Sequence, residues 1–280
     1  MKKHVLACWM CAVLTLCLAV RVSYGEDRPA PIVPKEKIAL FNGKDLTGFS
    51  TWLSDTKTED PRKVFTVAKD VDGAPAIHIS GDGFGGIITD KDYANYRLVA
   101  EFRWGDRTWG ARKDRTKDSG ILLHCFGPIG NAGPWMASVE CQLIEGGVGD
   151  FIVVRGKDAD GKPLIPTMTC EVAKDRDGET IWKKGGEKKV FTRGRINWFG
   201  RDPDWKDVLG FRGKVDVESP GKEWTRVEVI CNGDKITTMV NGVVVNEGSS
   251  IAPAAGRLQF QTEGAELYFR KIELHPLAGK

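Results

Sequence analysis

The sequence predicts an all-β protein, a sandwich or jelly roll of two antiparallel sheets, and three observations support this. Thirty-three glycines interrupt the 280 residues, apolar residues recur in short alternating runs, and almost no stretch shows a sustained helical period. Turn signals separate the runs at short intervals, which is typical of antiparallel strands. About 255 residues would remain after removal of an N-terminal leader, and that length suits one large β domain.

Residues 1–25 are expected to be a signal peptide. Lys2 and Lys3 precede an apolar run from Val5 to Val20, and small residues end the segment at Ser23–Gly25. The apolar run is short for a membrane span, and a retained N-terminal anchor is the alternative. The segment therefore predicts export of the mature chain.

Export changes the charge balance of the protein. The leader takes three basic residues from the 41 of the full chain and no acidic ones, which leaves 38 basic against 38 acidic residues. A net charge of zero without a basic cluster argues against a nucleic-acid partner. No association with a membrane is expected after the leader is cleaved.

Four cysteines remain in the mature chain: Cys125, Cys141, Cys170 and Cys231. An even number in an exported protein permits disulfide bonds, in any of three pairings. Free buried cysteines are the alternative, because a domain of this size has enough core without crosslinks. None of the spacings is that of a zinc site.

The predicted strands are short runs bounded by Gly, Pro, Asn or Asp, several of which alternate apolar and polar residues. In chain order they are Arg97–Trp104, Ile121–Phe126, Ser138–Ile144, Trp224–Cys231, Lys235–Val240, Val243–Asn246, Leu258–Thr262 and Glu266–Leu274. Asn241-Gly242 joins two of them and predicts a type I′ hairpin turn, because this dipeptide accepts the positive φ angles of that turn.

The amino-acid composition changes between about residue 150 and residue 221. This stretch is charged and rich in glycine, yet it contains four large aromatic residues, which argue against disorder. We therefore expect an ordered, aromatic-rich insertion over one end of the sheets. Arg195, Trp198 and Trp205 are its candidates for substrate binding, since an aromatic face suits the C–H face of a sugar. The alternative is that the tryptophans only anchor the insertion.

The candidate site lies on two strands joined by a loop, and Trp135 of this loop is a further candidate for substrate binding. Alternation puts Glu140 and Gln142 on one face of their strand, and His124 on one face of its neighbour. In a suitable register, an imidazole, a carboxylate and a carboxamide would converge on one surface. The alternative is an ordinary solvated face of an antiparallel sheet.

A later strand repeats this pattern, because Gln261 and Glu263 also stand at alternate positions. Together with the first pair they supply two carboxylates and two carboxamides for one face. Glu145 lies five positions from Glu140, so it is expected on the opposite face, as a structural or surface residue, unless a bulge intervenes.

Four segments, taken in order, carry a family resemblance. They are Phe41–Phe49, the strand Tyr96–Trp104 that leads into Asp118–Ile121, Glu140–Gln142, and Gly256–Glu266 followed by Phe269–Ile272. Together they resemble the 3-keto-disaccharide hydrolase domain family of exported bacterial proteins. The similarity covers residues 38–277, behind a linker at 26–37. It implies a concanavalin A-like sandwich in a periplasmic or extracellular protein.

The resemblance also implies a glycoside hydrolase or lyase that acts on sugars already oxidised at C3. A ketone at C3 acidifies the proton on C2, so a general base can remove it and the enolate can expel the group at C1. Such a site needs a base near C2, an acid near the glycosidic oxygen, and a positive charge or metal ion at the enolate oxygen. Addition of water gives hydrolysis, whereas departure of the unsaturated sugar gives a lyase.

Within this implied chemistry, Glu140 is expected to be the general base or a metal ligand, and Glu263 the opposite acid or a second ligand. His124 is expected to be a third metal ligand or a proton shuttle, although many relatives are expected to carry another residue there. Arg195 or a divalent metal ion would hold the enolate. The two glutamines beside the glutamates are expected to bind the carbohydrate substrate.

Two other functions fit the same fold. A retaining endoglucanase carries acidic residues at alternate positions of one strand. Here those positions hold Glu140, Gln142 and Ile144, and an isoleucine cannot be an acid. A non-catalytic carbohydrate-binding module would use Trp109 and the other exposed tryptophans as stacking platforms, with the glutamates as hydrogen-bond acceptors.

Overall fold

The computed structural model describes residues 29–278. The predicted signal peptide and the start of the linker therefore lie outside the described residues. Within the described range the regular secondary structure is β-strand, apart from one short 3-10 turn, η1, at Gly110–Arg112. No helix in this range is long and apolar enough to cross a membrane.

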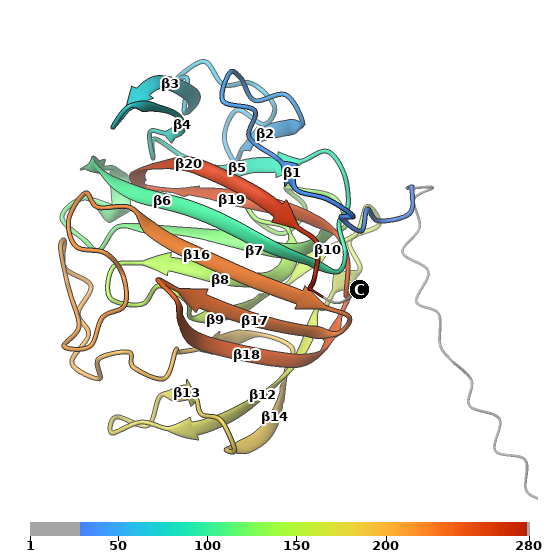
Figure 1. Cartoon of the computed structure of the whole chain (residues 1–280), viewed down its shortest axis with the longest axis vertical. Helices are drawn as coiled ribbons and strands as arrows, with labels where there is room; N and C mark the ends of the chain where they lie inside the picture. Colours follow the sequence, from blue (N-terminus) through green and yellow to red (C-terminus); the bar gives the residue numbers. More distant parts are fainter. Residues whose placement is uncertain (1–28, 279–280) are drawn as a thin grey trace, which may run out of the picture.

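The larger of two main sheets has eleven strands within the described part of the chain. They are β1 (Ile38–Ala39), β3 (Phe65–Val71), β4 (Ala74–Ile79), β6 (Tyr96–Thr108), β12 (Thr167–Lys174), β13 (Thr180–Trp182), β14 (Glu187–Phe191), β16 (Thr225–Asn232), β17 (Lys235–Val240), β18 (Val243–Ala252) and β20 (Ala265–His275). Their order is β13-β12-β18-β17-β16-β6-β20-β4-β3, with β1 beside β20 and β14 beside β12 (Figure 1).

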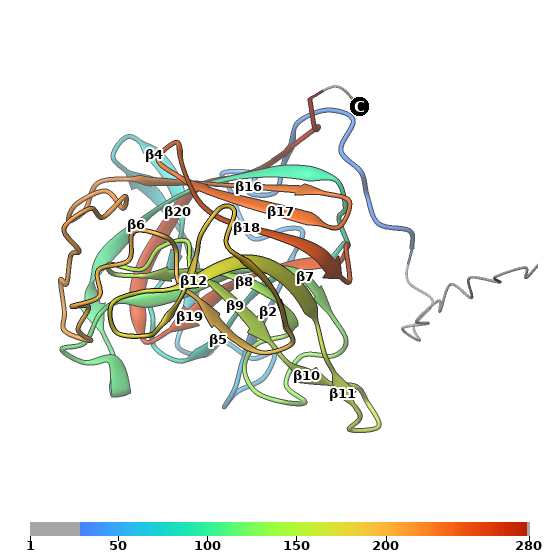
Figure 2. The same cartoon turned by 90° about the horizontal axis from the view of Figure 1, so that it is seen from below.

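The smaller main sheet has seven strands in the same range. They are β2 (Phe49–Leu53), β5 (Phe84–Thr89), β7 (Asp118–Phe126), β8 (Ala137–Ile144), β9 (Phe151–Val154), β15 (Gly194–Ile196) and β19 (Arg257–Glu263), in the order β15-β9-β8-β7-β19-β5-β2. A separate hairpin of β10 (Gly156–Lys157) and β11 (Pro163–Leu164) projects from this side of the molecule (Figure 2). Figure 2 shows the two main sheets as separate layers, with β16, β17 and β18 in one and β5, β8 and β9 in the other.

The core lies between the two layers and follows from strand alternation. On β8, Cys141 and Leu143 belong to the core cluster, so the residues between them face away from the other sheet. Phe260 of β19 meets Phe269 of β20 across the layers, with ring centroids 5.3 Å apart in an edge-to-face arrangement. The predicted all-β, concanavalin A-like sandwich of antiparallel sheets is confirmed.

The aromatic-rich stretch expected as an insertion is largely strand in its first half. Strands β9 and β15 extend the smaller sheet, and β12, β13 and β14 form one end of the larger sheet. The part without strands is 198–224, which wraps the end of the sandwich. Charged edge strands such as β14, whose residues are mostly exposed, carry little apolar alternation, so their pairing is not readable from the sequence.

The turn at Asn241-Gly242 is the predicted hairpin turn. Asn241 has φ +47° and Gly242 has φ +84°, and the turn joins β17 to β18. A type I′ turn needs positive φ at both central residues, which Asn and Gly tolerate best.

The four cysteines of the described chain are free and buried. Burial raises the pKa of the thiols of Cys125, Cys170 and Cys231 to about 12. Of the two alternatives for these cysteines, the structure has free core cysteines and not disulfide bonds.

Candidate active site

The candidate site lies on the face of the smaller sheet that points away from the core. Glu140 and Gln142 of β8 face outward, because their neighbours Cys141 and Leu143 point into the core. Gln261 and Glu263 of β19 face the same way. This face is nevertheless covered, since Glu140 is 3% exposed and Gln261 is fully buried.

Gly120 of β7 brings Glu140 and Gln261 close together. It lies between β8 and β19 in the sheet, and an added Cβ would stand 2.2 Å from Oε1 of Glu140 and 2.6 Å from Oε1 of Gln261. The missing side chain therefore provides the space in which the two polar groups meet. A residue with any side chain at position 120 would displace them.

A third carboxylate, Asp118, stands two residues before Gly120 on the same face. Gln142 donates a 2.7 Å hydrogen bond from Nε2 to Oδ1 of Asp118. Arg112 donates from Nη2 to the other carboxylate oxygen, and the same nitrogen lies 3.7 Å from Oε1 of Glu263. One arginine thus contacts two of the three acids.

The loop around η1 delivers Arg112 to the acids. Trp109 donates a backbone hydrogen bond to the carbonyl of Gly264, 2.7 Å away, which fixes this loop on the turn between β19 and β20. Gly264 has φ +76°, and a side chain there would meet Arg112 at 3.0 Å. Glycine at this turn therefore permits both the left-handed backbone and the close approach of the arginine.

Arg195 approaches the acids from the other side. Its Cα pairs with that of Ile152, which in turn pairs with Glu140, so Arg195 and Glu140 share a row across the sheet. Nη1 of Arg195 lies 2.8 Å from Oδ2 of Asp150, an oxygen that Arg201 also binds. The buried Asp150 holds Arg195 in place.

Burial of three carboxyl groups together shifts their proton affinities. Burial raises the pKa of Glu140 to about 8, and the charge of Asp118 adds to the rise. Burial also raises the pKa of Asp118 to about 6, although the positive charge of Arg112 lowers it. Burial and the two neighbouring acids raise the pKa of Glu263 well above its ordinary value. The group therefore carries exchangeable protons near neutral pH.

The two buried amides of the cluster differ in their contacts. Gln261 lies against Glu140, and its side chain lowers the pKa of that carboxyl. Oε1 of Gln142 makes no hydrogen bond within residues 29–278. Buried polar atoms are normally satisfied, so this oxygen is a candidate contact for water or a ligand.

His124 does not join the acids, contrary to the prediction. The pairing of β7 with β8 is irregular between Leu123 and Phe126, and His124 has φ +54°. This bulge turns the imidazole into the sandwich, where it contacts the ring of Tyr96 and its Nδ1 lies 3.2 Å from the carbonyl of Pro253. Burial lowers the pKa of His124 to about 4. Sequence alternation alone cannot anticipate such a bulge.

The tryptophans predicted to bind substrate have different positions. Trp135 packs on the same outer sheet face, beside Phe84, whose Cα pairs with that of Glu263. Trp198 is 1% exposed and part of the core, so it cannot stack on a ligand. Trp205 donates its indole N–H to the carbonyl of Glu145 and stacks on Arg201. Trp198 and Trp205 therefore anchor their segment, which was the alternative for them.

The predicted metal ligands are not assembled in the described part of the chain. Among residues 29–278 no group of three or more His, Cys, Asp and Glu side chains is placed to hold a metal ion. Arg112 lies between Asp118 and Glu263, and the bulge removes His124 from both glutamates. The site as built does not fit the predicted His124-Glu140-Glu263 ligand set.

Glu145 is structural, as expected from its place on the strand. Its Oε2 accepts hydrogen bonds from the backbone N–H groups of Lys117 at 3.0 Å and Gly210 at 2.8 Å. It ties the start of β7 to the strand-free segment that covers the end of the sheet.

Comparison with known proteins assigns the chain to a family. Residues 36–275 match the model of the 3-keto-alpha-glucoside-1,2-lyase-like domain. The chain belongs to that family. The match supports a carbohydrate-active protein. No curated protein sequence matches the chain.

The solved structures with a similar fold have low sequence identity to this chain. A provisionally assigned glycosyl hydrolase from Parabacteroides distasonis is 19% identical, with a TM-score of 0.47, over 86% of this chain and 94% of that one. A second such protein from the same organism is 16% identical, with a TM-score of 0.45, over 86% and 100% of the two chains. The carbohydrate binding module CBM66 from Bacillus subtilis is 10% identical, with a TM-score of 0.41, over 81% and 95%.

Asp118 and Arg112 belong to the site but were not among the predicted residues. Asp118 lies just before the strand predicted at Ile121–Phe126, because β7 begins three residues earlier than predicted. Arg112 has no signal in the sequence, since it comes from a loop whose position depends on the turn at Gly264.

Proposed function

We propose that the chain cleaves glycosides whose sugar ring carries a ketone at C3, by removal of the C2 proton and elimination of the group at C1. The observation that supports this most is the buried cluster of Asp118, Glu140 and Glu263, with Arg112 among the acids and Arg195 on the same sheet face. Elimination needs a base that accepts the C2 proton, an acid that donates a proton to the departing oxygen, and a cation that stabilises the enolate oxygen.

Glu140 is assigned as the general base in this proposal. Its carboxylate takes the proton from C2, and the C–H electrons form the C2–C3 double bond of an enolate whose negative charge rests on the C3 oxygen. A base works best when its pKa is near the working pH, and the pKa of Glu140 is raised to about 8. In this proposal the reacting carbon lies against the Glu140 carboxylate, which stands over Gly120.

Glu263 is assigned as the general acid. As the enolate re-forms the C3 ketone, the electrons move into a C1–C2 double bond, and the C1–oxygen bond breaks. The departing oxygen takes the proton of Glu263, because burial and the neighbouring acids raise the pKa of this carboxyl and favour its protonated form. The products are an unsaturated 3-keto sugar and an alcohol, and addition of water across C1–C2 would complete a hydrolysis.

The arginines supply the positive charge for the enolate oxygen. Arg112 bridges Asp118 and Glu263, and Arg195 is held toward Glu140 by Asp150. Fixed cations in a buried site stabilise developing negative charge more than they would in water. Gln142 and Gln261 are assigned to substrate hydroxyls, because these amides lie beside Asp118 and Glu140 on the same sheet face.

The test uses purified residues 26–280 with the 4-nitrophenyl glycosides of glucose and of 3-keto-glucose, in both anomeric forms. Release of nitrophenol from a 3-keto compound alone, with an ultraviolet absorbance from the enone, is the expected result. Glu140→Gln should lower the rate by about 10² to 10⁴. Release from the unoxidised glucoside at an equal rate, or binding of glycans without any turnover, would overturn the proposal, and the latter would favour a binding module.

We also propose that residues 1–25 direct export and are then removed. The support is the order of basic, apolar and small residues described above. Expression of the full chain in a Gram-negative host, followed by fractionation and N-terminal mass spectrometry, should give a periplasmic or secreted product that starts near Glu26. A full-length chain in the membrane fraction would establish a retained anchor.

A further inference from the structure

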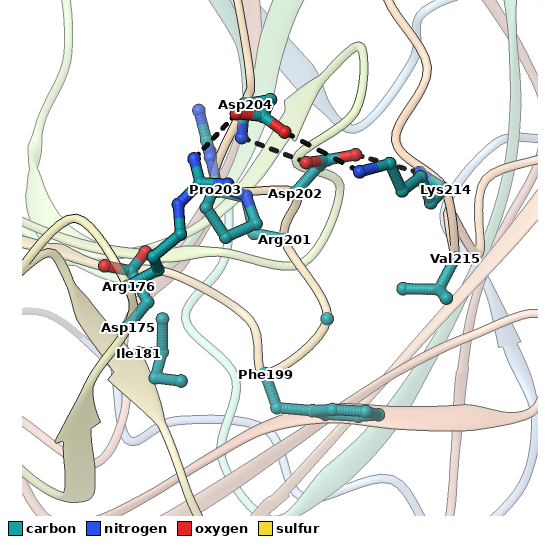
Figure 3. Close-up of a pocket in the computed structure, with 11 residues that line it drawn as sticks. Asp175, Arg176, Ile181, Phe199, Arg201, Asp202, Pro203, Asp204, Lys214 and Val215 are labelled. Atoms are coloured by element: carbon teal, nitrogen blue, oxygen red, sulfur yellow. Dashed lines mark hydrogen bonds and ion pairs between the residues drawn. The ribbon is translucent and has the colours of Figure 1, made fainter.

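A pocket of about 380 Å³ opens at the end of the sandwich, between the hairpin of β12 and β13 and the strand-free segment that follows Trp198. Figure 3 shows its two sides. The ring of Phe199 lies along one side, and the side chains of Asp202, Asp204 and Lys214 lie across the other. The acids of the candidate active site are not among its lining residues.

Phe199 is an aromatic side chain held in place but left half exposed. Its ring contacts the buried indoles of Trp198 and Trp182, with centroids 5.3 and 5.9 Å away, yet 47% of the residue is exposed. Gly200 makes this arrangement possible, since a side chain there would meet the indole of Trp198 at 2.3 Å. An ordered aromatic ring with a free face loses little entropy when a ligand stacks on it.

The polar side of the pocket is a paired, balanced set of charges. Arg176 donates to Asp204 at 2.6 Å, and Nζ of Lys214 lies 3.6 Å from the other oxygen of Asp204. Asp202 accepts backbone N–H bonds from Asp204 and Lys214 at 2.9 and 3.1 Å. The lining contains three acids and three bases: Asp175, Asp202, Asp204, Arg176, Arg201 and Lys214. Such a set offers donors and acceptors for hydroxyl groups but no excess charge for an ionic ligand.

We propose that this pocket binds a neutral sugar ring, stacked on Phe199 and hydrogen-bonded to Asp204 and its cationic partners. The axial C–H groups of a pyranose suit the electron-rich face of an aromatic ring, and its hydroxyls suit carboxylate and guanidinium groups. The proposal goes beyond the reaction assigned to Glu140, because binding here requires no ketone and no turnover. Arg201 lines the pocket and binds the same oxygen of Asp150 as Arg195 of the candidate active site. The two sites are therefore linked through Asp150.

The experiment uses residues 26–280 carrying Glu140→Gln, so that turnover does not enter, and calorimetric titration with maltotriose, cellotriose and trigalacturonate. A neutral trisaccharide should bind and the anionic one should not. Phe199→Ala should weaken binding about tenfold or more, equivalent to about 1.4 kcal/mol. Val190→Ala is the matched control, because Val190 is an exposed apolar residue on β14 outside the pocket. Asp204→Asn, a surface change, should weaken binding as well and serves if Phe199→Ala does not fold.

Absence of binding by both neutral trisaccharides at millimolar concentration would overturn the proposal. Equal affinities of the Phe199→Ala and Val190→Ala proteins, or preference for trigalacturonate, would overturn it too. In the active protein, a higher KM for long substrates after Phe199→Ala would identify the sugar as a distal unit of the substrate. An unchanged KM with lost trisaccharide binding would identify it as a separate glycan. Failure of the 3-keto assay leaves the titration unaffected, so the two proposals fail separately.

Discussion

Gln142 of β8 donates a hydrogen bond from Nε2 to Oδ1 of Asp118 on the neighbouring strand β7, and the two atoms are 2.7 Å apart. The other oxygen of Asp118 is bound by Arg112, which also lies near Glu263. Asp118 therefore connects to Gln142 of β8 directly and to Glu263 of β19 through Arg112. The aspartate is held from both sides, and its charge acts on both glutamates.

Asp118→Asn should lower the rate of 3-keto-glycoside cleavage and shift its pH dependence. Loss of the negative charge removes one cause of the raised pKa of Glu140, so that pKa should fall. Because the base must be ionised, the rising limb of kcat/KM against pH should move to lower pH. Asp234→Asn, a change at an exposed residue, is the control and should leave the profile in place. An unchanged profile in Asp118→Asn would contradict the coupling.

Glu140→Gln should stabilise the protein at neutral and alkaline pH. The pKa of Glu140 is about 8 in the fold against 4.5 as its ordinary value, so the folded state binds the proton more tightly than the unfolded state. The contribution of this group to the free energy of unfolding is full below about pH 4.5 and is lost as the pH rises toward 8, by up to about 1.4 kcal/mol per pH unit.

The measurement for Glu140→Gln is urea unfolding of both proteins from pH 5 to 8. The variant should gain on the wild type as the pH rises. Glu187→Gln, at an exposed position of β14, should follow the wild type at every pH. A constant difference between Glu140→Gln and the wild type would show that the carboxyl does not titrate in this range.

The fold, and the position of two Glu–Gln pairs on one sheet face, could be predicted from the sequence. Glu140 and Gln142, and Gln261 and Glu263, share a face because the period of a strand is two, and this holds without knowledge of the register. Asp118 joins them only through the pairing of β7 with β8, which a sequence does not fix. His124 leaves the face at a bulge of one residue, and a shift of one residue changes the face of every position after it.

The two arginines near the acidic residues come from outside the strands that the sequence predicted. Arg112 comes from the loop on Gly264, and Arg195 from a three-residue edge strand within a charged stretch. Neither location has a hydrophobic period from which a direction could be predicted. Arg195 is a predicted site residue because of its residue type alone. Its buried partner in the structure, Asp150, was not predicted from the sequence.

His124→Asn should lower stability and leave catalysis intact. Asparagine accepts the positive φ at this bulge, but it loses the edge contact with Tyr96. The free energy of unfolding should therefore fall by about 1–3 kcal/mol, while kcat stays within about twofold of the wild type. Thermal unfolding and steady-state assays on the same preparation check both parts. A large fall in kcat in a well-folded variant would return the imidazole to the reaction.

Gly120→Ala should abolish activity with a small cost in stability. The new methyl group would stand 2.2 Å from Oε1 of Glu140, so the carboxyl must leave the position from which it is proposed to act. The cost to the fold is small because the atoms that must move are the ends of flexible side chains, and Gly120 does not have a positive φ.

A steady-state assay and a urea unfolding curve on the same Gly120→Ala preparation separate these effects. We expect a loss of at least about 10² in kcat/KM, since misplacement of a base by about 1 Å has effects of this size. Gly156→Ala, also on a strand and without positive φ, is the matched control, because its new methyl group would meet only Ala137. Retention of activity by Gly120→Ala would show that Glu140 does not act from above this glycine, and the assignment of the base would then pass to Asp118 or Glu263.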